Sequence, residues 1–412
     1  MAAGAGYAPA PADESANPRH DSWIVAIVGF CIFLGVYSTQ TLLPSLQHLF
    51  GASEVQVSAT VSATTAAVAL AAPLVGLIAD RWERRHLISA ALFGLALFTL
   101  LSASASNLAE LVAYRFATGL FVPFAYIGTM SYIAESRASR VGLTMARFVS
   151  GTVIGGFSGR AVSGLFAGAS DWRLAFVVLG ALTALGAIVT ALRLPLTTRP
   201  ATGTSTGFLV ASYGAILKTP ALIAVFATGF GTLFAQVAMF TYVNFHLSAS
   251  PYDLGPAMLA GIFGVYLIGA IVTLPAGRAI DRFGYRRVFF AATATGMVGV
   301  LITLAAPLWA IIGGLAVSAS GTFACQAAAT TALGQAAGPA RSQAAGLYVA
   351  FYYLGGSVGG ALPGMFWHTG GWPACVMLVA ASQILAMGIV ATVWPSGGAA
   401  KLSPETSQAA RL

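Results

Sequence analysis

The sequence predicts an all-α membrane protein with twelve transmembrane helices in two pseudo-symmetric six-helix bundles. Three observations support this: the composition, the number of long apolar stretches, and one charged motif that occurs twice. Only 8% of the residues are charged, 58% are hydrophobic, and the mean hydropathy is +0.83. Soluble domains carry about 25% charged residues, so this chain has too few to cover a water-exposed surface.

Twelve stretches are long enough to cross a bilayer, which takes about 20 mostly apolar residues. We expect helices at about 23–47, 58–79, 86–105, 108–133, 143–167, 173–194, 220–247, 256–276, 288–306, 308–336, 342–367 and 373–394. They divide the chain into a disordered tail (1–21), a first bundle (22–194), a linker (195–219), a second bundle (220–395) and a tail (396–412). The first stretch is too long for a signal-peptide core and is interpreted as an uncleaved span.

The positions of the basic residues predict the orientation. Placing the N-terminus in the cytoplasm puts 17 of the 20 Lys and Arg residues on the cytoplasmic side and only Arg173 outside. Cytoplasmic loops of membrane proteins are enriched in Lys and Arg. We therefore expect a multi-pass protein of a bacterial inner membrane with both termini in the cytoplasm. Because the charges lie in short loops, the net charge of +8 does not indicate nucleic-acid binding.

The repeated motif follows the second and the eighth stretch. It comprises Gly76, Asp80, Arg81 and Arg85, and its four residues recur 201 positions later as Gly277, Asp281, Arg282 and Arg286. An Asp at a helix end can face the positive N-terminus of a neighbouring helix, and the arginines can pair across a cytoplasmic opening. Contacts of this kind suit a gate; the simpler interpretation is that they only anchor topology. Glu83 replaces the Gly found at the second copy, Gly284.

Glycines at spacings of four residues predict close helix packing. Small residues at this spacing let helix backbones approach each other in lipid. The residues concerned are Gly151, Gly155, Gly159, Gly355 and Gly359.

Two arginines lie within predicted spans, Arg115 in the fourth and Arg160 in the fifth. A charge at membrane depth is by default a candidate for function. Both are expected at similar depth in the outer half, where they would form a shared positive site, with Glu110 as the nearest counter-ion. A second interpretation is that Arg115 pairs with Glu110 and backbone carbonyls while Arg160 reaches the interface.

Polar side chains on the first, fourth and seventh spans supply the remaining candidates for substrate binding or proton coupling: Gln40, Tyr126 and Gln236. Tyr126 shares a helical face with Arg115 and Gly119.

These motifs resemble those of the major facilitator superfamily. The loop motif stands where that family carries it, and Arg115-Phe-Ala-Thr-Gly119 is similar to the family's fourth-helix motif, whose Arg is associated with proton coupling. The stretch from Gly151 to Arg160 partly resembles the fifth-helix motif of proton-driven antiporters, with Gly156 at the usual Pro and Arg160 at the usual Gly. The resemblance implies alternating access and is nearest to bacterial drug–proton antiporters and arabinose-efflux-like proteins.

The sequence therefore suggests a secondary transporter, and proton-coupled efflux of a small molecule is the favoured mode. No mid-span Asp or Glu is present, which disfavours a cationic substrate and leaves anion exchange or uniport open. A proton-coupled importer would share the same fold, and a membrane sensor is the least favoured function. No Walker motif, metal-ligand spacing or nucleophile elbow occurs, so neither an enzyme, a cofactor nor a metal is expected. A complete twelve-helix unit suggests a monomer in the lipid bilayer.

Overall fold

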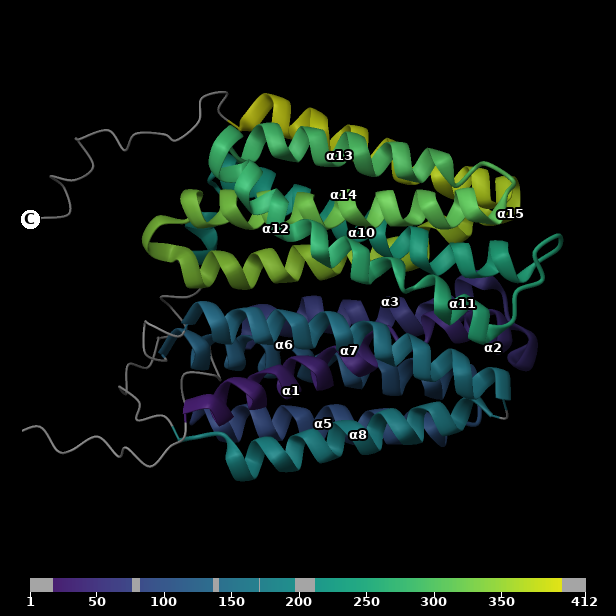
Figure 1. The fold of residues 1–412 in the computed structure, drawn as a ribbon, viewed down its shortest axis with the longest axis horizontal. Helices are drawn as coiled ribbons and strands as arrows, with labels where there is room; N and C mark the ends of the chain where they lie inside the picture. Colours follow the sequence, from purple (N-terminus) through teal and green to yellow (C-terminus); the bar gives the residue numbers. More distant parts are fainter. Residues whose placement is uncertain (1–17, 76–81, 136–140, 170, 197–211, 395–412) are drawn as a thin grey trace, which may run out of the picture.

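The computed structural model describes residues 18–75, 82–135, 141–169, 171–196 and 212–394, and every regular element in these ranges is a helix (Figure 1). The first half contains α1 (Pro18–Val36), η1 (Gln40–Leu42), α2 (Leu43–Phe50), α3 (Glu54–Ala71), η2 (Ala72–Leu74), α5 (Arg84–Ala103), α6 (Leu108–Glu135), α7 (Val141–Ala169) and α8 (Trp172–Arg193). The second half contains α10 (Pro220–Ser248), α11 (Pro256–Ile262), α12 (Val265–Phe283), α13 (Tyr285–Ile302), α14 (Leu308–Ala336), η4 (Gly338–Ala340) and α15 (Arg341–Val393).

Each of the twelve expected stretches contains helix within the described residues. Within the described ranges, nine helices are long and apolar enough to cross a membrane, judged by length and composition. The longest of these runs over Gln343–Val393 and is interrupted at Gly371 (φ 55°, ψ −144°), so it contains two of the expected spans. The stretches expected at 143–167 and 288–306 correspond to α7 and α13. The prediction of twelve helices in an all-α membrane fold is confirmed.

Two of the expected continuous helices are broken. The stretch expected at 23–47 ends as a helix at Val36, turns, and resumes at Gln40. In the turn, Ser38 Oγ donates to the carbonyl oxygen of Gly35 at 2.9 Å. Ser and Thr side chains compete in this way with helical hydrogen bonds, and Ser38 is followed by Thr39. The stretch expected at 256–276 is likewise divided between α11 and α12, with Phe263 and Gly264 between them.

The two halves use glycine in the same way at positions 200 residues apart. Gly155 of α7 lies against the carbonyl oxygen of Phe30 in α1. In the second half, Gly355 of α15 lies against the carbonyl oxygen of Phe230 in α10, so both members of the pair are 200 residues further along the chain. One turn later, Gly159 and Gly359 lie against Leu34 and Phe234 in the same manner. A Cβ atom at any of these glycines would overlap a backbone oxygen. The close pairing of α1 with α7 is therefore repeated in that of α10 with α15.

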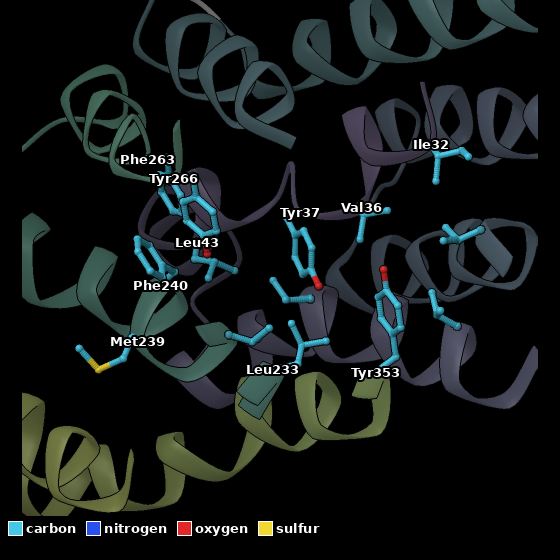
Figure 2. Packing of buried hydrophobic residues seen from close by; sticks show 14 of the residues in the cluster. Ile32, Val36, Tyr37, Leu43, Leu233, Met239, Phe240, Phe263, Tyr266 and Tyr353 are labelled. Carbon is cyan, nitrogen blue, oxygen red and sulfur yellow. The ribbon is translucent and has the colours of Figure 1, made fainter. Parts of the chain in front are cut away.

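The helix bundle has two distinct ends. The terminal end carries the start of α1 and the end of α15, and the opposite end, called here the α2–α11 end, carries α2 and α11 (Figure 1). One buried core runs across both halves near the α2–α11 end and includes Leu43 of α2, Phe240 of α10 and Phe263 (Figure 2). The site described next lies in this core, at the break in α1.

Candidate transport site at the break in α1

Arg115 binds the end of helix α1. Its side chain is fully buried, and Nη2 donates to the carbonyl oxygens of Gly35 at 2.6 Å and Val36 at 2.8 Å. Since α1 ends at Val36, these carbonyls belong to its last turn, which lacks helical partners and carries partial negative charge. Nε and Nη1 of Arg115 are buried without a hydrogen-bond partner among the described residues. The partial negative charge at the end of α1 therefore compensates part of the positive charge of Arg115.

Glu110 does not fill the role of counter-ion. Its Oε2 accepts a hydrogen bond from the backbone N–H of Ser106 at 2.8 Å, and its own N–H donates to Asn107 Oδ1 at 2.9 Å. The carboxylate therefore closes the start of α6. Arg115 therefore contacts the end of α1 and not Glu110, the counter-ion expected from the sequence. This contact depends on where α1 breaks, which residue spacing does not predict.

Arg160 occupies a box of aromatic rings. It is 3% exposed, and its guanidinium carbon lies 4.8 Å from the ring centroid of Tyr37, 4.9 Å from that of Phe263 and 4.8 Å from that of Tyr266. Tyr37 lies in the break of α1, whereas Phe263 and Tyr266 belong to the second half. Figure 2 shows Phe263 and Tyr266 together, with Tyr37 beside them. Burying a charge costs several kcal/mol, and a desolvated cation–π contact returns about 2 kcal/mol.

Gln40 links Arg160 to the second half. Arg160 Nε donates to Gln40 Oε1 at 2.9 Å, and Gln40 Nε2 donates to Thr241 Oγ1 of α10 at 3.1 Å. The other hydrogen bonds at this place are internal to the first half: Arg160 Nη1 donates to Gly156 O at 2.6 Å, and Thr41 Oγ1 donates to Arg160 O at 3.2 Å. Every one of these partners is neutral. None of the ion pairs found within the described ranges involves Arg115 or Arg160.

The structure brings together Gln40, Arg160 and Gln236 from three different helices. Gln236 of α10 lies near the side chain of Tyr266, which in turn lies against Arg160. Tyr126 stands apart on α6, where its ring lies 6.2 Å from Phe33 and 5.4 Å from Phe148. It also lies close enough to Tyr348 and Tyr353 of α15 to interact with them electrostatically, so it is near the interface of the two halves.

Three tyrosines of α15, which are also candidate cavity residues by sequence, form a second polar element. The rings of Tyr348 and Tyr352 stack at 5.8 Å, and those of Tyr352 and Tyr353 meet edge-on at 5.6 Å. The Tyr348 hydroxyl is buried without a hydrogen-bond partner among the described residues. The spacing of the three tyrosines, within one and a half turns of a helix, is visible in the sequence. The direction in which their rings point is not.

The two copies of the loop motif are placed unequally. Gly76, Asp80 and Arg81 lie outside the described residues, and Arg85 is partly buried at the start of α5. In the second copy Asp281 and Arg282 are exposed, and Arg282 lies 5.0 Å from the ring of Phe283. Arg286 Nη2 donates to the carbonyl oxygen of Ala391 in α15 at 2.9 Å. Gly277 has no neighbour within 4 Å of the place where its Cβ would be.

The turns of the two motif copies differ, as the Glu83 for Gly284 exchange predicts. Gly284 has φ 82°, which favours glycine, whereas Glu83 has φ −64° and caps α5 by accepting from the His86 N–H at 3.0 Å. Next to Glu83, Arg84 forms an ion pair with Glu135 of α6 at 2.9 Å. This ion pair could not be predicted from the sequence, because its two partners are 51 residues apart.

Contacts between the halves gather at the α2–α11 end. Ser58 of α3 and the Tyr242 hydroxyl of α10 lie 3.3 Å apart, and Tyr242 donates to Gly360 O at 2.9 Å. Glu54 of α3 lies 3.8 Å from His368 of α15. Toward the other end, Tyr213 donates to the carbonyl oxygen of Pro73 at 2.9 Å, and burial raises the pKa of Tyr213, which keeps this hydroxyl a donor. The halves therefore meet through polar contacts that rigid-body movement can break.

Comparison with known proteins establishes the family. The sequence profile of the Major Facilitator Superfamily matches residues 25–272 and 262–410. The chain belongs to the major facilitator superfamily. Among curated relatives of this superfamily member, the inner membrane transport protein YnfM of Escherichia coli (strain K12) is 30% identical, with 87% of each chain covered. An uncharacterized transporter of Buchnera aphidicola subsp. Schizaphis graminum is 30% identical over 84% of each chain.

Solved structures agree with this fold. A crystal structure of the nucleoside transporter NupG aligns with a TM-score of 0.72, at 15% identity, over 91% of this chain and 99% of the other. At that identity the likeness shows the fold alone. This superfamily member is thus a multi-pass membrane transporter.

Proposed function

We propose that this chain exports a small molecule across the membrane by alternating access, with proton entry driving export. The observation that carries the proposal is the closed α2–α11 end, where Gln40–Thr241, Ser58–Tyr242 and Glu54–His368 join two halves that are each held by their own helix packing. Separating the halves there breaks these polar contacts together with the packing of α7 on α11 and of α3 on α15, and leaves the helices intact. Two packed arrangements that differ in this way are what alternating access requires.

The break in α1 supports a binding site at this level of the bundle. Transporters commonly bind substrates at discontinuous helices, whose ends present charge and unsatisfied backbone groups. Here Arg115 and Arg160 both contact the segment from Gly35 to Thr41. The charge distribution predicts that the α2–α11 end faces the outside, so the described state is closed to the outside under this orientation.

Export is favoured over import by the packing of α7 on α1. The glycines Gly151, Gly155 and Gly159 that partly resemble an antiporter motif lie directly against Ala26, Phe30 and Leu34. Protons would enter through a titrating group away from the arginines, since no described carboxylate pairs with Arg115 or Arg160. Glu110 and His246 are the described candidates, with Asp80 outside the described residues.

Anion exchange or uniport is the second candidate. The same two arginines favour it, because each is buried and lacks a carboxylate partner among the described residues. A transporter that moves a negative charge with the help of a resident cation needs no proton.

One experiment separates these candidates. The purified protein is reconstituted in liposomes under an imposed pH gradient, and neutral and anionic solutes are screened beside cationic dyes. Proton-coupled export predicts that a transported solute moves protons in the opposite direction and that Arg115→Ala or Arg160→Ala abolishes this movement. Solute flux without proton flux would replace the exporter with exchange or uniport, and proton flux in the same direction as the solute would indicate an importer.

A further inference from the structure

Arg160 differs from the other buried arginine in where its partners come from. Arg115 is held by carbonyls of α1, in its own half. Two of the three rings around Arg160, Phe263 and Tyr266, belong to the opposite half. Any movement that separates the halves at the α2–α11 end removes these two rings and leaves Arg160 with Tyr37, Gln40 and its own helix.

The neutral partners of Arg160 are weak competitors for an anion. A ring face offers only its quadrupole, and Gln40 offers a neutral amide oxygen at 2.9 Å. A carboxylate accepts two parallel hydrogen bonds from a guanidinium and brings a full opposite charge. The closed state therefore shields a cation that no described carboxylate neutralises, and an open state would present it in an apolar, ring-lined setting.

We propose that Arg160 is the receptor for an anionic substrate, and that this substrate is a small organic monocarboxylate with an apolar body. The inference rests on the alternating access proposed above. Because Arg160 is uncovered when the α2–α11 end opens to the outside, it fits the anion exchange or uniport candidate and not proton-driven export. One guanidinium is uncovered by the movement, so one negative charge is recognised. Tyr37, which stays with Arg160, favours an apolar or aromatic body. Gln40 would be displaced from Arg160 Nε.

The test measures whether carboxylates bind in preference to their neutral amides. The probes are hexanoate, benzoate, phenylacetate and indole-3-acetate, each compared with its amide by thermal stabilisation of the purified protein and by uptake into liposomes. At least one carboxylate should bind the wild type and its amide should not. Arg160→Gln should weaken that binding at least ten-fold, and Arg160→Lys, which keeps the charge without the planar fork, should give an intermediate value.

Arg173→Gln is the matched control. Arg173 also lies over a ring, that of Trp172 at 4.7 Å, but at the start of α8 and away from the α1 break. Its variant should bind carboxylates as the wild type does. The proposal is overturned if none of the four carboxylates binds the wild type, if the amides bind equally well, or if Arg160→Gln binds as tightly as the wild type.

A second variant covers the case in which Arg160→Gln does not fold. Phe263→Leu combined with Tyr266→Leu removes the competing rings of the second half and keeps the cation. Carboxylate binding should become about three-fold tighter, and an unchanged or weaker binding would count against the proposal.

Spin labels separate this inference from the proposed function. Gln56→Cys and Thr369→Cys place labels on exposed positions of the two halves, and the described native cysteines Cys31, Cys325 and Cys375 are buried. If the distance between the labels changes with conditions but no carboxylate binds, only the inference fails. If the distance never changes, alternating access itself fails.

Discussion

Helices α1 and α10 hold equivalent places in the two halves, yet only α1 is broken. Both pack against glycines 200 residues apart, Gly155 for α1 and Gly355 for α10. In α10 the residues that correspond to the break, Val237 to Met239, continue the helix and are buried. What differs is the surroundings: positions 115 and 160 are arginines, and their counterparts are Leu315 and Gly360.

This difference shows how a duplicated scaffold acquires one polar site. Leu315 has no donor, so a break in α10 would leave carbonyls unsatisfied, whereas Arg115 binds those of Gly35 and Val36. At the second position, Gly360 brings α15 against Ser62 of α3, and Arg160 instead places a charge between the halves. At these equivalent positions the second half therefore provides close helix packing through Gly360, and the first half provides a buried charge through Arg160.

The largest effect should come from the packing that both halves share. Gly159→Val and Gly359→Val each place a side chain on a backbone oxygen, of Leu34 or Phe234. Overpacking costs about 1–3 kcal/mol and sometimes more, so both variants should lose most folded protein, as measured by size-exclusion yield and melting temperature. The control Gly313→Ala, with no neighbour within 4 Å, should be tolerated. If only one of the two variants lost folded protein, the packing of α1 and that of α10 would not be equivalent.

Arg115→Leu gives the first half the residue of the second. The carbonyl oxygen of Val36 loses its arginine donor, whereas that of Gly35 keeps Ser38 Oγ, and an unsatisfied buried group costs about 1–3 kcal/mol. We expect a lower melting temperature and transport reduced at least ten-fold, measured as initial rates in liposomes. Leu315→Met, a volume-conserving change at the counterpart, should leave both quantities nearly unaltered. Full transport by Arg115→Leu would mean that the α1 break does not need its arginine.

Gln40→Glu sharpens the contrast between the two arginines. It places a carboxylate beside Arg160 Nε, where Gln40 Oε1 now lies at 2.9 Å. A resident counter-ion should raise the melting temperature by a few degrees and weaken carboxylate binding about ten-fold. Gln335→Glu, at an exposed position of α14, adds the same charge elsewhere and serves as the control. Unchanged carboxylate binding in Gln40→Glu would contradict the role given to Arg160.

The smallest effect concerns the contact of Glu54 with His368. The separation is 3.8 Å and the His368 side chain is 59% exposed, and exposed ion pairs contribute about 0–1 kcal/mol. Glu54→Gln should therefore shift the spin-label distances toward an open α2–α11 end by no more than a few-fold in population. A shift as large as that of Phe263→Leu combined with Tyr266→Leu would show that this contact, and not the ring box, holds the end closed.

Much of this molecule could be predicted from the sequence, and for a physical reason. Helices that cross a bilayer must satisfy their backbone internally, so apolar length alone reveals them. The twelve stretches, the duplication and the burial of Arg115 and Arg160 were all readable because they depend on residue type and spacing. The family followed from the same motifs.

The contacts of those residues were decided only in the tertiary structure. Spacing pointed from Arg115 to Glu110, one turn away, but the guanidinium binds the end of α1, which exists only because α1 breaks at Val36. The rings around Arg160 come partly from residues more than 100 positions away. Both sets of contacts depend on how each helix is rotated about its axis and on how the two halves pack together. The side-chain pattern does not determine either, because any apolar helix face can lie against lipid. The sequence by itself determined which helices exist and which charges they bury, and the packing decided what those charges touch.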